Sequence, residues 1–164
     1  MTTPLNSGRA HYAPAGATPV LRVRLAQEHL SIIGGITEQG RLYLHEYPHT
    51  VRQQQVVAFL EHLERTIAGP LLMIWDGARI HRGKDVQEHL ARIGAQHVRI
   101  EILPAYAPAL NPIEGVWQYL KCRELKNICC RDCRELGTEF RYANERMRKK
   151  PQMIKACFMH VGYY

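Results

Sequence analysis

Two acidic residues stand where carboxylates can do chemistry. Asp76 directly follows the apolar run LLMIW at 71–75, and Glu114 lies in the proline-rich stretch LPAYAPALNPIEGVW at 103–117. Carboxylates on neighbouring elements can share divalent cations, because Mg²⁺ prefers oxygen ligands and takes only one or two from protein carboxylates. Two such ions about 3.5–4 Å apart activate a nucleophile and stabilise the leaving oxygen. The pair therefore makes metal-assisted phosphoryl transfer a candidate chemistry.

Each acid alone also has a plainer interpretation. A lone Asp at a strand end is usually a turn or helix-capping residue. Pro108 and Pro112 keep the residues before them out of helix, which makes Asn111 the expected N-cap, Pro112 the first helical residue and Glu114 the third. The helix dipole favours a carboxylate there. A capping role explains why an acid stands at position 114, but it does not explain why the loop before it is so rigid. Accurate placement of a metal ligand would explain that rigidity.

Hydrophobic patterning predicts the elements that must position these acids. Apolar or alternating runs predict strands over 29–37, 41–47, 71–75 and 98–103. A turn at Gly40 makes the first two strands a hairpin. Apolar residues at helical spacing predict helices over 51–68, 84–93, 112–125, 134–149 and 151–159. The first 19 residues, rich in Pro, Gly, Ala and Thr, are expected to be loop-like.

This order of elements, β-β-α-β-α-β-α, predicts an α/β fold with a mixed sheet flanked by helices. The run 71–75 has no polar residue, so we expect a central strand buried on both faces. Functional groups in such folds gather beyond the carboxyl ends of parallel strands. Asp76 and Glu114 are both expected at that edge.

The charge of the chain is positive and unevenly distributed. The net charge is +7, and residues 121–155 hold eleven Lys and Arg against five Asp and Glu, which gives +6 for that segment. A phosphate backbone is the commonest partner of such a face. A solvated helix surface with ion pairs explains the same pattern equally well.

Several classes of protein are disfavoured by composition. The sequence has no apolar run long enough to span a membrane and no secretory signal, so we expect a cytoplasmic protein without a membrane partner. Its 164 residues suit one domain. Five cysteines, an odd number, indicate reduced thiols rather than a disulfide framework. Cys130 and Cys133 form a C-x-x-C pair, but a structural zinc site would need a second pair.

The two acidic segments resemble motifs of one protein family. WDGARIH at 75–81 and LPAYAPALNPIEGVW at 103–117 are similar to the second and third acid motifs of mariner-like bacterial insertion-sequence transposases, D-N-A-x-x-H and L-P-x-Y-S-P-x-L-N-P-I-E-x-x-W. The 37 residues between Asp76 and Glu114 are close to the spacing in that family. HYAPAGATPVLRV at 11–23 resembles the segment after its first acid.

The resemblance implies a ribonuclease H-like fold and metal-dependent DNA strand cleavage and transfer. Asp76 and Glu114 would be catalytic members of an Asp-Asp-Glu triad that binds two Mg²⁺ or Mn²⁺ ions. The implied DNA partners are transposon ends and target. His81, Asn111 and Trp117 would shape the site, and for Trp117 a place in the core is at least as well supported as DNA contact. The basic residues expected to bind DNA are Lys121, Arg123, Lys126, Arg131 and Arg134.

The sequence also departs from the family pattern. Gly77 replaces the usual Asn, and no Asp or Glu precedes Glu28, so the first acid and the opening strand are missing. We therefore expect a partial catalytic domain over 1–125, with 126–164 as a basic helical extension of it. Its activity would depend on an upstream transposase portion or on another chain in an oligomer. The alternative is a catalytically inactive DNA-binding or regulatory remnant of a transposase.

Overall fold

The computed structural model describes residues 3–4, 29–104, 107–126, 128 and 130–162. The segment 11–23, which carries part of the family resemblance, lies outside the described residues. So does nearly all of the expected N-terminal loop.

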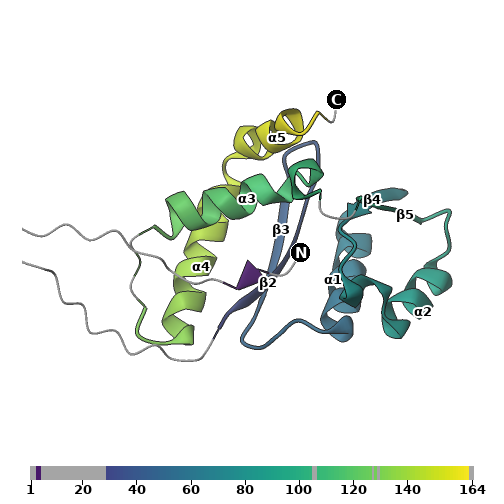
Figure 1. Cartoon of the computed structure of the whole chain (residues 1–164), viewed down its shortest axis with the longest axis horizontal. Helices are drawn as coiled ribbons and strands as arrows, with labels where there is room; N and C mark the ends of the chain where they lie inside the picture. Colours follow the sequence, from purple (N-terminus) through teal and green to yellow (C-terminus); the bar gives the residue numbers. More distant parts are fainter. Residues whose placement is uncertain (1–2, 5–28, 105–106, 127, 129, 163–164) are drawn as a thin grey trace, which may run out of the picture.

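An antiparallel hairpin forms the centre of the fold (Figure 1). Strands β2 (Ser31–Ile36) and β3 (Leu42–Tyr47) pair along their whole length. Gly40 lies in the connecting turn with a φ of +86°, a conformation that residues with a Cβ rarely adopt. A two-residue strand, β1 (Thr3–Pro4), pairs antiparallel with the start of β2. The hairpin and its turn confirm the prediction from sequence.

A second, parallel sheet contains β4 (Leu71–Trp75) and β5 (Val98–Ile102), in register over all five residues. The connection between them runs through the 3₁₀ helix η1 (Arg79–Arg82) and α2 (Lys84–Ile93). Because the strands are parallel, their carboxyl ends meet at one edge.

The remaining helices lie on two sides of the hairpin (Figure 1). Their bounds are α1 (Gln53–Thr66), the 3₁₀ turn η2 (Pro108–Leu110), α3 (Ile113–Tyr119), the π-helical turn η3 (Leu120–Glu124), α4 (Cys133–Arg148) and α5 (Pro151–His160). In the described ranges, no helix is long and apolar enough to cross a bilayer.

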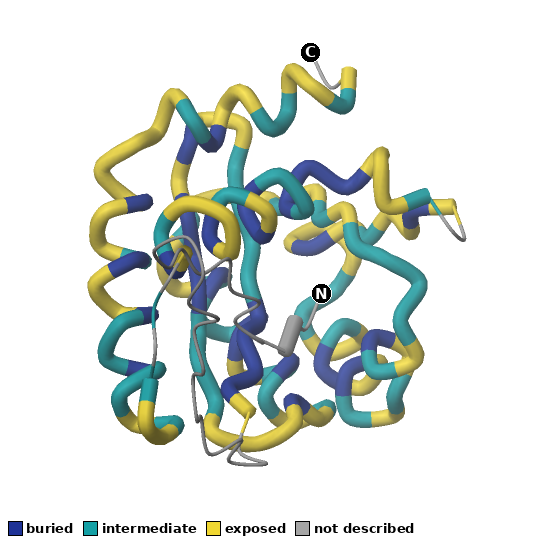
Figure 2. The backbone as a smooth tube through the Cα atoms, turned by 60° about the vertical axis from the view of Figure 1, so that its left-hand side comes forward, coloured by how far each residue is buried: buried dark blue, intermediate teal, exposed yellow. Residues whose placement is uncertain are grey.

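Alternation along the hairpin creates two cores, because successive side chains of a strand point to opposite faces. Ile32 and Leu44 pack with α3, α4 and α5, and Trp117 of α3 is among the largest fully buried side chains there. Ile33 and Tyr43 pack on the other face with α1. Figure 2 shows the buried positions along these elements in dark blue.

Two expectations about the sheet are wrong. The described strands form two separate sheets, ordered β1-β2-β3 and β4-β5, instead of one mixed sheet. Strand β4 is also not buried on both faces, because Leu72 is 63% exposed and Ile74 is 38% exposed. The physical reason is that Leu71, Met73 and Trp75 pack on the core beside α1, so Leu72 and Ile74 point to the opposite face of the strand.

Candidate active site

Asp76 is the first residue after β4 and lies at the carboxyl edge of the parallel sheet. Its Oδ1 accepts a hydrogen bond from the backbone amide of Ala78 over 3.1 Å, which fixes the turn that follows the strand. The side chain of Arg82 donates to the carbonyl oxygen of Gly77, the residue that departs from the family motif. The turn is therefore held by hydrogen bonds on both sides of Gly77.

His81 is positioned against Asp76 by aromatic stacking. Its ring is stacked on Trp75 with centroids 4.5 Å apart, and the residue is only 5% exposed. Nε2 of His81 lies 3.1 Å from Oδ1 of Asp76. The contact is not an aligned hydrogen bond, since neither ring nitrogen has a partner of hydrogen-bond geometry among the described residues. The close His81 ring and the Ala78 amide, acting against burial, lower the pKa of Asp76 to about 2.

Glu114 is the second residue of α3, and its backbone amide donates to the carbonyl oxygen of Asn111 over 3.0 Å. One carboxylate oxygen, Oε1, is buried without a hydrogen-bond partner in the described part of the molecule. Burial raises the pKa of this carboxyl group, Lys121 lowers it, and the negative charge of Asp76 raises it further. Burial is thus the main cause of the raised pKa of Glu114, and the charge of Asp76 adds a smaller effect in the same direction.

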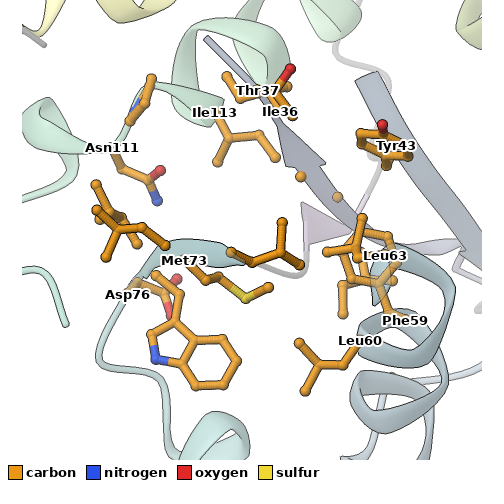
Figure 3. A pocket seen from close by; sticks show the side chains of 18 of the residues that line it. Ile36, Thr37, Tyr43, Phe59, Leu60, Leu63, Met73, Asp76, Asn111 and Ile113 are labelled. Carbon is orange, nitrogen blue, oxygen red and sulfur yellow. The ribbon is translucent and has the colours of Figure 1, made fainter. Parts of the chain in front are cut away.

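The prediction that the side chain of Asn111 caps the helix is wrong. The helix begins at Ile113, and no side-chain hydrogen bond caps its start. The backbone carbonyl of Asn111 accepts the first bond, while its side chain is buried and lines a cavity beside Asp76, His81 and Ile113. Figure 3 shows the Asn111 and Asp76 side chains at this cavity. The reason is that a side chain turned into the cavity cannot reach back to the helix amides.

The donor set of this site suits a hard divalent cation. Asp76 is ionised, Glu114 has an unpartnered buried oxygen, and a cation between the two would relieve their repulsion. Carboxylate oxygens are the ligands that Mg²⁺ and Mn²⁺ take in proteins. In the ranges that the structure describes, no group of three or more His, Cys, Asp or Glu side chains could hold a metal ion. Among the described residues, Asp76 and Glu114 are therefore two candidate ligands, and they do not form a complete metal site.

The other residues singled out by sequence occupy two environments. Trp117 lies in the core with only 2% exposure and packs among Ile113, Val116 and their neighbours. The five basic residues expected to bind DNA, Lys121, Arg123, Lys126, Arg131 and Arg134, are all exposed. Arg131 forms an ion pair with Glu135, and Lys121 is near enough to Glu114 to affect its pKa.

Sequence reasoning missed two residues, one that organises the site and one that joins the helices behind it. Trp75, the stacking partner of His81, was treated only as part of an apolar strand, although a Trp directly before Asp76 is a usable signal. Glu124 is the other. Its side chain is 7% exposed and accepts hydrogen bonds from Arg146 and Lys150, each over 2.7 Å. Burial alone would raise the pKa of Glu124, but these two bonds outweigh it and lower the pKa.

Comparison with known proteins gives a family match and a fold match. The model of the DDE superfamily endonuclease family matches residues 4–136. A Mos1 transposase paired-end complex with the left transposon end has a TM-score of 0.61 and 17% identity, over 100% of this chain and 55% of that chain. The catalytic domain of Mos1 mariner transposase has a TM-score of 0.56 and 15% identity, over 100% of this chain and 81% of that chain.

A third solved structure, of the Mos1 transposase catalytic domain and Raltegravir with Mg, gives a TM-score of 0.54 and 18% identity, over 84% of this chain and 77% of that chain. No curated protein matches the sequence. The chain spans about half, 55%, of the first transposase chain above. These likenesses confirm the α/β, ribonuclease H-like fold class expected from the sequence.

Proposed function

This chain belongs to the DDE superfamily endonucleases, and we propose that it forms the catalytic core of a bacterial insertion-sequence transposase that cleaves and joins DNA strands with Mg²⁺ or Mn²⁺. The observation that carries the proposal is the buried, unpartnered Oε1 of Glu114 near the ionised carboxylate of Asp76. Burying a carboxylate without a partner is costly. A cation that both acids bind would offset that cost.

Asp76 and Glu114 would hold the cation, and bound divalent ions supply an activated nucleophile and stabilisation of the leaving oxygen. The protein contributes position and charge. The Ala78 amide and the stacked His81 ring hold Asp76 ionised in a fixed turn. The burial of Glu114 strengthens its attraction for a cation, because charges interact more strongly away from water. A solved Mos1 catalytic domain with Mg supports this choice of ion.

Binding of Mn²⁺ tests the proposal directly. Electron paramagnetic resonance titration of the whole chain should detect a bound ion, and Asp76→Asn or Glu114→Gln should weaken the binding at least tenfold. Glu88→Gln is the matched control, because Glu88 is an exposed carboxylate on α2 that pairs with Lys84. Unchanged Mn²⁺ affinity in both site variants would refute the assignment of these ligands.

With only two described carboxylates at the site, we expect this chain alone to show little or no strand cleavage with Mg²⁺ or Mn²⁺. Metal affinity falls as ligands are removed, and a two-ion site needs accurately placed groups on both ions. Robust cleavage by the 164-residue chain that is abolished by Asp76→Ala would reveal a third ligand. If cleavage by the chain alone is weak or absent, as we expect, the complete activity depends on a further transposase portion or on an oligomer.

We also propose that DNA contacts the exposed basic residues around η3 and the start of α4. Lys121 and Arg123 are on η3, directly after the helix that carries Glu114, so DNA bound there would reach the carboxylates. The affinity of the double variant Lys121→Ala/Arg123→Ala for duplex DNA should fall. The slope of log K against log salt concentration should become less negative by about 0.9 for each lost phosphate contact. Lys84→Ala, on α2, is the control. Unaltered salt dependence would contradict this DNA-binding face.

The same exposed basic residues support the second candidate, a DNA-binding or regulatory remnant without catalysis. Chains of this kind would bind DNA with steep salt dependence and would not bind Mn²⁺ at Asp76 and Glu114. The two titrations together separate the candidates, because a catalytic core requires both activities.

A further inference from the structure

Helix α5 lies beside α3 and runs in the opposite direction (Figure 1). Lys150, directly before α5, donates a hydrogen bond over 3.0 Å to the hydroxyl group of Tyr119, the last residue of α3. Near the other end of α5, Cys157 lies against Gly115, the third residue of α3. The start of α5 is thus fixed to the end of α3, and its later part reaches the turn that carries Glu114.

Gly115 allows the two helices to come into close contact. A Cβ at this position would lie 2.8 Å from Sγ and 3.4 Å from Cβ of Cys157, whereas carbon atoms in contact are normally about 3.5–4.0 Å apart. The sulfur is itself held, since it donates to the carbonyl oxygen of Met153 over 3.4 Å. Glycine is a poor helix former, so local preference does not explain its place in the first turn of α3. The contact with α5 does explain it.

Helix α3 is held on two sides, and Glu114 projects between them. Ile113 and Trp117 are on the side that packs in the core against the hairpin. Gly115 and Tyr119, four residues apart, are on the side that contacts α5. Successive residues of a helix are about 100° apart, so Glu114 lies between these two sides. Any shift of α3 away from α5 therefore moves Glu114 as well.

The next residue of α5 reaches the candidate active site. Phe158 lines the same cavity as Asp76, His81 and Asn111. Helix α5 therefore contacts both the wall of the site and the helix that carries Glu114. It lies beyond residues 4–136, which the family model matches, so that match assigns it no role.

We propose that Cys157 is a positioning residue, which sets the position of α3 through its contact with Gly115 and so holds Glu114 where it can bind a divalent cation together with Asp76. The binding of that cation belongs to the proposed function, on which this role rests. Cys157 itself touches neither the cation nor DNA. Its contribution is the space that its side chain occupies beside α3.

An exchange of volume between positions 115 and 157 tests the proposal. Gly115→Ala places a methyl group against Sγ of Cys157, so the Mn²⁺ affinity of the whole chain should fall at least fivefold in the paramagnetic resonance titration. Gly115→Ala/Cys157→Ala removes the sulfur and leaves the new methyl group 3.4 Å from Cβ of residue 157, so the affinity should return to within twofold of the unaltered chain. Cys157→Val adds bulk from α5 and should act as Gly115→Ala does, which keeps the test decisive if Gly115→Ala fails to fold.

A measurement without metal follows the position of α3 directly. The chain has two tryptophans, Trp117 on α3 and Trp75 at the end of β4. Fluorine NMR of the chain labelled with 5-fluorotryptophan therefore gives one resonance for each, and Trp75→Phe assigns them. Gly115→Ala should shift the Trp117 resonance, because Trp117 moves with α3, and Gly115→Ala/Cys157→Ala should restore it.

His89→Ala is the matched control for stability. It removes a buried contact between α2 and Glu64 of α1, so it should lower the unfolding midpoint without shifting the Trp117 resonance or weakening Mn²⁺ binding. An unshifted Trp117 resonance in both Gly115→Ala and Cys157→Val, effects that the double variant does not reverse, or equal effects in His89→Ala would each overturn the role of Cys157. If the unaltered chain binds no Mn²⁺, the proposed function fails, and the fluorine resonance still decides whether Cys157 sets the position of α3.

Discussion

Gly34 and Gly35 are adjacent in β2, yet the structure predicts opposite effects of alanine at the two positions. A Cβ on Gly34 would lie 2.5 Å from Cδ2 of Leu44, 2.8 Å from Cη2 of Trp117 and 3.1 Å from Cδ1 of Ile113. Carbon atoms in contact are normally about 3.5–4.0 Å apart. All three neighbours are buried, so none of them can move aside into solvent.

Overpacking of a core by one methyl group costs about 1–3 kcal/mol, and alanine recovers roughly 0.5–1 kcal/mol over glycine in a strand. Gly34→Ala should therefore lower the free energy of unfolding by about 1–2 kcal/mol, which corresponds to roughly 2–8 °C in the thermal midpoint for a chain of this size. Gly35→Ala is the control. Its Cβ would meet only Phe59 at an ordinary 3.6 Å, so the variant should be as stable as the unaltered chain or slightly more stable.

Urea unfolding followed by far-ultraviolet circular dichroism measures both variants under one condition. Because Trp117 and Ile113 belong to the helix that carries Glu114, Gly34→Ala should also weaken Mn²⁺ binding. Gly34→Ala as stable as the unaltered chain would refute the packing around Trp117. An equal loss in Gly35→Ala would show that the strand itself, and not the clash, determines the effect.

Three further predictions concern charge. The pKa of Asp76 is lowered to about 2 from 3.8, so its ionised form should contribute at most about 2 kcal/mol to the free energy of unfolding above pH 4. This contribution is lost as the pH falls through 2. The difference in stability between the unaltered chain and Asp76→Asn should therefore shrink between about pH 5 and pH 2.5. Because burial raises the pKa of Glu114, its charged form is the disfavoured one. Without metal, Glu114→Gln should be at least as stable as the unaltered chain at pH 7, and that advantage should diminish as the pH falls towards 5 in urea unfolding. Glu124→Gln should cost about 1–2 kcal/mol, because the buried group loses its negative charge and one of the two oxygens that accept from Arg146 and Lys150, which are themselves partly exposed; an unchanged urea midpoint would contradict this role.

Local patterning predicted most of the elements of this fold. The expected helix over 84–93 and the strand over 71–75 agree with α2 and β4 at both ends. These bounds are predictable because glycine, proline and a change of hydrophobic period are properties of neighbouring residues. The expected helix over 112–125 is less regular, since it begins at Ile113 and ends in the π-helical turn η3.

The sequence also predicted that the two acids meet near one edge of a sheet, because parallel strands end together. It could not identify Trp75 as the surface on which His81 stacks. Nor could it identify Glu124 as the acceptor for two cations, Arg146 of α4 and Lys150 directly before α5. Both contacts join side chains whose distance depends on how elements pack. No spacing along the chain encodes them.

The sequence by itself determined the strands, the helices and the positions of Asp76 and Glu114 along them, since these follow from short-range backbone preferences and the alternation of apolar residues. Only the tertiary structure decided that Asn111 turns into a cavity, that Glu114 has a buried oxygen without a partner among the described residues, and that the described strands β2 and β4 belong to two different sheets. Strand pairing and burial are set by residues far apart in the chain, and their energies depend on which surfaces meet.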